Sequence, residues 1–249
     1  MPCSLIREFI PKRPSGDEFI RFENVSFRYP VSDADAASLA GDEREQCLSG
    51  ISFALRRGES LGIIGPTGCG KTTIINLLMR FYDVEDGVVF QNDMVFYNSL
   101  RENIRFGRDL DEADLMRAVE DAVAAEYITS LEQGLDYQAD IKGANLSGGQ
   151  KQRQLISRAL AGNPEILILD DSSSALDYKT DAALRRAIFE NHSDSTTIMI
   201  AQRVSSIQQM THILVMEEGR CIGYGAHEEL LKTCPAYREI YQAQMGALT

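Results

Sequence analysis

Short apolar runs alternate with amphipathic stretches along the chain. Residues 60–64, 166–169 and 196–200 form runs of four or five mostly apolar residues, the pattern of strands that are buried on both faces of a parallel sheet. Residues 71–82 and 148–160 place apolar side chains three and four positions apart, as a helix with one buried face does. Strands and helices that alternate in this way predict an α/β core.

Further elements flank this core. Alternation of apolar and polar residues from Phe19 to Tyr29 predicts an antiparallel strand that ends at Pro30, and a second strand is expected over 51–55. Between them, residues 31–46 are acidic and alanine-rich, which favours a surface insertion. The remaining expected elements are helices over 112–131 and 182–189, a hairpin over 213–222 and a helical tail from Glu228.

Charge and cysteine content exclude several classes of protein. Asp and Glu number 37 against 25 Lys and Arg, and the net charge of −12 would repel nucleic acid on average. Five scattered cysteines without a C-x-x-C pair indicate a reducing compartment. No run approaches the roughly eighteen apolar residues of a membrane helix, so the chain is not expected to span a bilayer by itself. Residues 1–18 are interpreted as a linker rather than a secretory signal.

The first chemical motif lies between a predicted strand and a predicted helix. Residues 65–72 read G-P-T-G-C-G-K-T and satisfy the phosphate-loop pattern G-x-x-x-x-G-K-[ST]. In such a loop, backbone N–H groups and the helix N-terminus surround phosphate oxygens, Lys71 reaches the β- and γ-phosphates, and Thr72 offers its hydroxyl to Mg²⁺. The alternative, a chance glycine-rich turn, is disfavoured by the strand-loop-helix context. The predicted ATP-binding residues here are Gly65, Pro66, Thr67, Gly68, Cys69, Gly70, Lys71, Thr72 and Thr73.

A carboxylate follows the buried run 166–169. Asp170 occupies the position from which P-loop NTPases hold Mg²⁺, directly or through water. Buried strands also end in aspartate without binding a metal, so this assignment depends on the neighbouring motifs. ATP and Mg²⁺ are the expected ligands.

A second motif, L-S-G-G-Q-K-Q-R at 146–153, resembles the signature sequence of ABC ATPases, and the chain after Phe19 is similar to the ATP-binding domain of an ABC transporter. The resemblance implies a P-loop NTPase (RecA-like) core over 19–249 with an antiparallel β subdomain and an α-helical signature subdomain over about 96–158. It also implies a head-to-tail dimer, in which the helix after Ser147 faces the γ-phosphate of the opposite subunit's ATP. A helix N-cap with only a local role is the alternative. The signature residues are Leu146, Ser147, Gly148, Gly149 and Gln150.

The same resemblance assigns roles to further positions. Tyr29 is similar to the aromatic residue that stacks on adenine, although a tyrosine at a strand end is more often a packing residue. Gln91 is similar to the glutamine that binds Mg²⁺ and the attacking water. Residues 96–107 resemble the exporter branch in the segment that meets the membrane domain. The residues similar to the dimer-interface loop are Ser174, Ala175, Leu176 and Asp177.

Two positions depart from the family pattern, and both belong to the nucleotide site on this chain's own phosphate loop. Asp171 stands where exporter motors have the glutamate that acts on the attacking water, and its shorter side chain withdraws the carboxylate by about one bond length. Gln202 stands where the family has a histidine that contacts the γ-phosphate, and an amide does not titrate near neutral pH. With an intact signature, this combination resembles the degenerate-site subunit of a heterodimeric exporter. Neutral drift in a working homodimer is the alternative.

The interval between the phosphate loop and the glutamine is also unusual. Lys71 and Gln91 lie 20 positions apart, whereas the family inserts a strand, a turn and a short helix before the strand that leads to this glutamine. The antiparallel subdomain is therefore expected to lack one or more strands. A natural deletion, a segment missing from the sequence as given, and an engineered shortening would each account for this.

These motifs together predict an ATP-driven transport motor at the cytoplasmic face of the cell membrane. It would act with a transmembrane domain and with a second ATP-binding domain, a heterodimer partner. A non-hydrolysing ATP clamp that controls dimerisation is the alternative, because Asp171 and Gln202 both depart from the catalytic pattern. A chromosome-maintenance ATPase is set aside, since Thr72 and Leu146 are too close in sequence for the long coiled coils of that class.

Overall fold

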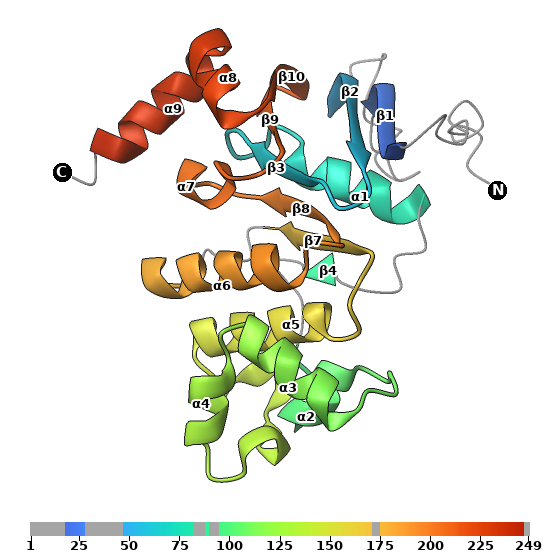
Figure 1. Cartoon of the computed structure of the whole chain (residues 1–249), viewed down its shortest axis with the longest axis vertical. Helices are drawn as coiled ribbons and strands as arrows, with labels where there is room; N and C mark the ends of the chain where they lie inside the picture. The colour runs from blue at the N-terminus through green and yellow to red at the C-terminus, as the bar shows by residue number, and fades with distance from the viewer. Residues whose placement is uncertain (1–17, 28–46, 82–87, 90–94, 171–174, 247–249) are drawn as a thin grey trace, which may run out of the picture.

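A six-stranded sheet forms the centre of the computed structural model (Figure 1), in the order β10-β9-β3-β8-β7-β4. All neighbouring strands from β9 to β4 are parallel, and β10 is antiparallel to β9. The strands are β3 Ser60–Ile64, β4 Val88–Val89, β7 Ile166–Asp170, β8 Thr196–Ile200, β9 His212–Glu217 and β10 Arg220–Gly225. The structure describes residues 18–27, 47–81, 88–89, 95–170 and 175–246.

The sheet is covered on both faces, which explains the unbroken apolar runs of its inner strands. Along β7, Ile166 and Ile168 point into one hydrophobic cluster, and Leu167 and Leu169 point into the other. The first cluster holds α1 (Lys71–Phe81) and the strands β1 and β2. The second holds α5 (Gly148–Leu160) and α6 (Tyr178–Asn191). The predicted α/β core is confirmed.

Gly62 of β3, which has no side chain, lets α7 (Val204–Ile207) pack directly on this strand. A Cβ on Gly62 would lie 2.6 Å from the Cβ of Ile207, so only glycine allows this approach. The contact fixes where the chain runs after it leaves β8. The segment that contains Gln202 therefore starts at the sheet edge and continues into a helix held against β3.

An antiparallel pair of strands packs on the same face of the central sheet as α1. β1 (Glu18–Phe27) pairs with β2 (Leu48–Arg56), and Phe22 stacks on Phe53 with 4.5 Å between ring centroids. The predicted strand from Phe19 is confirmed, and the second strand is longer than expected. Tyr29, Pro30 and the expected insertion lie outside the described residues.

The helices α2 to α5 gather at one end of the molecule (Figure 1). The single helix expected over 112–131 is wrong, because the chain breaks between α3 and α4. Val123 adopts a left-handed backbone with φ of 55°, and Arg153 Nη1 donates to its carbonyl oxygen at 2.9 Å. The turn brings Tyr127 under the same guanidinium, 4.8 Å from the ring centroid. The elements here are β5 Asn98–Ser99, α2 Leu100–Arg105, α3 Glu112–Asp121, α4 Ala125–Ser130, η1 Gly134–Asp136, β6 Gln138–Ala139 and η2 Ile141–Gly143.

Two helices close the described chain. The predicted helical tail is confirmed, but it divides into α8 (His227–Thr233) and α9 (Pro235–Gly246). The division falls at a proline, which lacks the N–H that would continue α8. α6 is longer than expected, because Asp177 accepts from Thr180 N at 2.9 Å and so caps a helix that begins one turn before its apolar face.

Candidate functional site

The described residues that are predicted to bind phosphate and Mg²⁺ meet at the carboxyl edge of the sheet. Ile200, the last residue of β8, pairs with Ile63 of β3 on one side and with Asp170 of β7 on the other. The loop after β3, the end of β7 and the segment around Gln202 therefore leave the sheet side by side. Open α/β sheets bind ligands at this edge.

The phosphate loop is a tight turn that packs closely against the start of β2. The N–H of Cys69 donates to Pro66 O at 3.4 Å, and the chain enters α1 directly afterwards. Gly70 has φ of 97°, and a Cβ there would lie 2.6 Å from Leu48 Cδ2 and 2.8 Å from Cys47 O. The sequence of the first turn of α1 carries no acidic side chain. This helix start therefore presents N–H groups with no acidic side chain from its own first turn beside them.

The ammonium group of Lys71 lies over the loop from which it projects. Its Nζ donates to Gly65 O and Pro66 O, both at 2.8 Å, and it lies 3.8 Å from Cys69 Sγ. These acceptors are neutral, and a phosphate oxygen forms a stronger, charge-assisted hydrogen bond with the same group. The contacts hold a full positive charge at the place where the phosphates of a nucleotide would lie.

A hydroxyl and a carboxylate stand together beside this loop. Thr72 Oγ1 donates to Asp170 Oδ2 at 3.1 Å, and Asp170 is only 6% exposed. Oxygen ligands from a hydroxyl and a carboxylate are the kind that Mg²⁺ prefers beside nucleotide phosphates. The two residues therefore fit a Mg²⁺ ion bound through α1 and β7.

The hairpin of β9 and β10 supports the phosphate loop from a position that the sequence did not reveal. The N–H of Gly219 donates to Cys69 O at 3.2 Å, and a Cβ on Gly65 would lie 2.2 Å from Met216 O. The turn itself could be predicted from its glycine. Its location under the phosphate loop comes from strand order, because β9 lies next to β3.

The signature segment begins α5, as predicted. Ser147 is its N-cap in a capping box: Gln150 N donates to Ser147 Oγ at 3.3 Å, and Ser147 N donates to Gln150 Oε1 at 2.9 Å. Leu146 is buried, whereas Ser147 and Gly148 are exposed. The local cap role is thus present. The start of α5 is nevertheless exposed, and its first turn contains no acidic residue.

The segment similar to a dimer-interface loop lies against this helix start. A Cβ on Gly149 would lie 3.4 Å from Ala175 O and 3.9 Å from Leu176 Cδ2. Asp177 follows as the exposed N-cap of α6, where hydrogen bonds from the backbone and the side chain of Thr180 hold the pKa of its carboxyl below the usual range. The fold brings these two predicted interface segments together on one surface.

Not every predicted residue can be placed. Tyr29, Gln91, Asp171 and Ser174 lie outside the described residues. Gln202 is exposed on the segment between β8 and α7.

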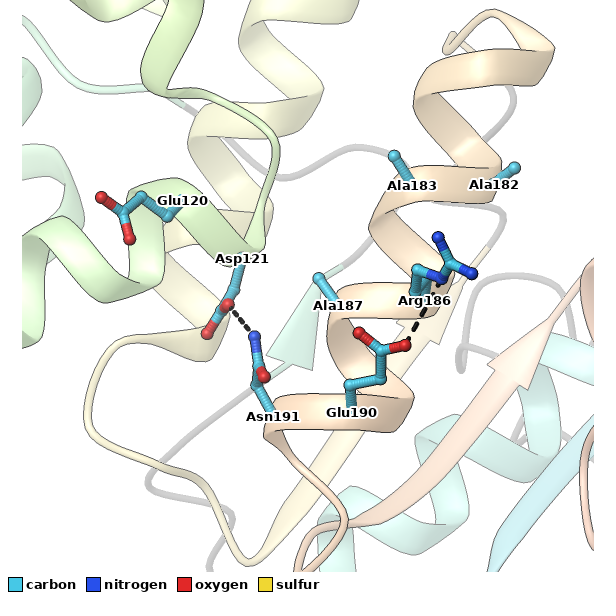
Figure 2. A pocket seen from close by; sticks show the side chains of 8 residues that line it. All are labelled: Glu120, Asp121, Ala182, Ala183, Arg186, Ala187, Glu190 and Asn191. Carbon is cyan, nitrogen blue, oxygen red and sulfur yellow. Dashed lines mark hydrogen bonds and ion pairs between the residues drawn. The ribbon is translucent and has the colours of Figure 1, made fainter.

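A cleft of about 570 Å³ lies elsewhere, between α3 and α6 (Figure 2). None of the predicted site residues that the structure describes lines it. The lining residues are Glu120, Asp121, Ala182, Ala183, Arg186, Ala187, Glu190 and Asn191. Arg186, the basic residue of this lining, already pairs with a carboxylate there, with Nε 3.4 Å from Glu190 Oε1. We therefore place the candidate nucleotide site at the sheet edge and not in this cleft.

Comparison with known proteins agrees with this geometry. Residues 48–174 match the family described as ABC transporter. The chain is 36% identical to the ATP-dependent lipid A-core flippase of Photobacterium profundum, over 94% of this chain and 42% of that protein. It is 38% identical to a probable multidrug resistance ABC transporter ATP-binding/permease protein, YheI, of Bacillus subtilis, over 94% of this chain and 43% of that protein.

A solved structure gives the same result. A bacterial Atm1-family ABC exporter with ATP bound superposes with a TM-score of 0.80 at 34% identity, over 90% of this chain and 41% of that chain. The chain thus spans less than half the length of the relatives it matches. Within the described ranges, every helix is too short or too polar to cross a bilayer. The phosphate loop, the signature helix and these relatives lead to one conclusion: the chain belongs to the ABC transporter family, as an ATP-binding domain of the exporter type.

Proposed function

We propose that this chain is the ATP-hydrolysing motor of an exporter, which dimerises around two ATP molecules to drive a substrate across a membrane. Residues 1–18 would link it to a membrane domain, and 19–249 would form the motor with its helical subdomain over about 96–158. Its place would be the cytoplasmic face of the cell membrane. The sequence and the similarity to known exporters support an exporter, and the substrate would be selected by the membrane domain.

One structural observation supports the dimer above all. Helix α1, which follows the phosphate loop, packs on one face of the sheet, whereas α5, which follows the signature, packs on the other. The exposed signature start adjoins the exposed residue Ala175. A second chain, turned head to tail, could place its signature over this chain's phosphate loop while it receives the same contact in return.

ATP would be held chiefly by charge and backbone N–H groups. Lys71 and the N–H groups of 65–73 would bind the phosphates, and the adenine would stack on Tyr29. Thr72, Asp170 and Gln91 would bind Mg²⁺, whose role when bound is to neutralise charge on the β- and γ-phosphates. Leu146 to Gln150 would contact the partner's ATP.

The site on this chain's own phosphate loop would hydrolyse ATP slowly. Asp171 offers a shortened carboxylate to the attacking water, and Gln202 offers an amide in place of a titratable histidine. A heterodimer partner with glutamate and histidine at these positions would then supply the faster site. The same two residues favour a second candidate function, a clamp that dimerises on ATP and never hydrolyses it.

Two defective variants of this chain test the shared site. Lys71→Ala would lose its own phosphate binding but keep a signature, whereas Ser147→Arg would keep the phosphate loop but block the signature with a bulky side chain. Either variant alone should release no phosphate from ATP. In an equal mixture, half of the dimers contain one complete site of two, so about a quarter of the normal rate should return.

In the matched control, Lys71→Ala is mixed with a double variant that carries both Lys71→Ala and Ser147→Arg. No dimer in that mixture contains a complete site, because every phosphate loop lacks its lysine. Recovery only in the first mixture supports the shared-site motor. Dimerisation on ATP without phosphate release in any sample, the unaltered chain included, would indicate the clamp. Full activity of Ser147→Arg alone would refute both.

A further inference from the structure

A side chain near the end of α9 holds the segment that carries Gln202. Gln244 Nε2 donates to Gln202 O at 2.8 Å, and Gln244 Oε1 accepts from Val204 N at 2.8 Å. Gln202 and Val204 lie 42 and 40 positions before Gln244 in the chain. Figure 1 shows α9 beside α7, which begins at Val204. One amide side chain thus bridges the start of a helix and the residue proposed to contact a γ-phosphate.

The two hydrogen bonds restrict the backbone on both sides of Arg203. An amide side chain that pairs with a C=O and with the N–H two residues later copies the pairing of a β-ladder. Gln202 O and Val204 N therefore both have a protein partner. The pairing also fixes the direction of the peptide group after Gln202. The two hydrogen bonds therefore hold the backbone from which the exposed side chain of Gln202 projects.

The continuation of the same segment is held from the opposite side by α6. Arg185 Nη1 donates to Ser205 O, and Ser206 Oγ donates to Asp181 Oδ2 at 3.4 Å. Asp181 is 1% exposed and pairs with Arg185 Nη2 at 3.0 Å. Residues 202–206 are therefore attached to two helices, by Gln244 on one side and by this buried ion pair on the other.

The second attachment leads back to the predicted dimer surface. α6 begins at its N-cap Asp177, and Asp181 and Arg185 follow at intervals of one helical turn. α6 therefore connects the interface segment to the backbone of Ser205, and Gln244 holds the same loop at Gln202.

We infer that Gln244 is a positioning residue, which holds Gln202 toward the γ-phosphate of a nucleotide bound at the phosphate loop. The inference rests on the proposed function, because it requires that ATP binds at Lys71 and that Gln202 contacts its terminal phosphate. Gln244 itself touches no nucleotide. Its effect is therefore expected on the discrimination between ATP and ADP, which differ only in the γ-phosphate.

The test measures dissociation constants of MgATP and MgADP on the unaltered chain and its variants. Gln202→Ala and Gln244→Ala should each lower the preference for ATP over ADP about fivefold, the size of one lost hydrogen bond. Gln244→Glu should do the same, since its carboxylate keeps the bond from Val204 N and repels Gln202 O. The affinity for MgADP should stay within about twofold, because the phosphate loop is untouched.

The matched control is Gln242→Ala, an exposed glutamine on the same helix, which should change neither constant. The variant with both Gln202→Ala and Gln244→Ala tests whether Gln244 acts through Gln202. If Gln244 acts through Gln202, the double variant should discriminate no worse than Gln202→Ala alone. Thermal unfolding of each variant separates a repositioned loop from a destabilised domain.

Three results would overturn the inference in distinguishable ways. An effect of Gln202→Ala with none of Gln244→Ala would show that the segment keeps its orientation without α9. Additive losses in the double variant would show that Gln244 acts by another route. An unchanged preference in Gln202→Ala would remove the contact that Gln244 is inferred to position, and failure of the unaltered chain to bind MgATP would refute the proposed function itself.

Discussion

His192 Nε2 lies 2.9 Å from Asp121 Oδ2, and this buried contact joins the end of α6 to the end of α3. The two side chains are 3% and 5% exposed. Asn191 Nδ2 donates to the other carboxylate oxygen at 2.5 Å, as Figure 2 shows at the edge of the cleft. One carboxylate, with a partner on each of its oxygens, therefore links α3 of the helical group that carries the signature to the end of α6.

We expect Asp121→Ala to lower the free energy of unfolding by about 1 to 3 kcal/mol, because it leaves the buried ring nitrogen of His192 without its partner and removes the hydrogen bond from the exposed Asn191. The measurement is equilibrium denaturation in urea. At the exposed rim of the same cleft, Arg186 Nε lies 3.4 Å from Glu190 Oε1, with side chains 78% and 65% exposed. Arg186→Ala is the matched control and should cost less than about 0.5 kcal/mol. Equal losses in the two variants would contradict a structural role for the buried contact.

Lys71→Ala should abolish MgATP binding without unfolding the domain. The ammonium is the full positive charge aimed at the terminal phosphates. Among the described residues it bonds two replaceable carbonyl oxygens of its own loop, Gly65 O and Pro66 O, and the thiol of Cys69. Titration calorimetry gives the affinity, and circular dichroism verifies the fold. Lys232→Ala, at an exposed position of α8, should bind as the unaltered chain does. Unchanged affinity in Lys71→Ala would refute the site assignment.

Bound nucleotide should protect Cys69 from alkylation. This thiol is 5% exposed and lies 3.8 Å from Lys71 Nζ, inside the loop that would wrap the phosphates. A maleimide adduct there would fill the phosphate position, so labelling should also block ATP binding. Mass spectrometry of labelled peptides compares the rates with and without MgATP. Cys221, half-buried on β10, is the internal reference, and its rate should not change. Equal protection of both cysteines would indicate general closure of the fold instead.

Much of this core could be predicted, because its strands and helices are patterned over long segments. The runs that became β7 and β8 needed burial on both faces, and only a parallel sheet covered by helices supplies this. The predicted bounds of the helix over 148–160 agree with α5, because the S-x-x-Q pattern of Ser147 and Gln150 marks a capping box in the sequence.

The errors have local causes. A continuous helix over 112–131 ignored the left-handed turn at Val123, which the sequence does not mark with glycine and which Arg153 stabilises from another helix. The role of Gln244 was invisible for a similar reason. Its partners lie at 202 and 204, and nothing in a sequence shows that two segments so far apart exchange hydrogen bonds.

Restoration of the family's catalytic residues tests whether this chain's own site is slow for the proposed reason. Asp171→Glu returns the full reach of the carboxylate toward the attacking water, and Gln202→His returns a titratable group to the γ-phosphate position. Each change alone should raise the rate of phosphate release by a small factor. The remaining defect still limits the same step, since both groups would act on one transition state.

The variant with both Asp171→Glu and Gln202→His should exceed either single change by at least about tenfold, because groups that act on one transition state are not additive. The gain should lie in kcat, since the phosphate loop that sets nucleotide affinity is unchanged. It should also depend on Gln244, because the new histidine would occupy a backbone position that this side chain holds through Gln202 O at 2.8 Å. Steady-state hydrolysis with and without Gln244→Ala measures this. A flat rate in the double variant would show that the slow step lies elsewhere, with the short interval before Gln91 as the next candidate, and would remove the support for a degenerate site.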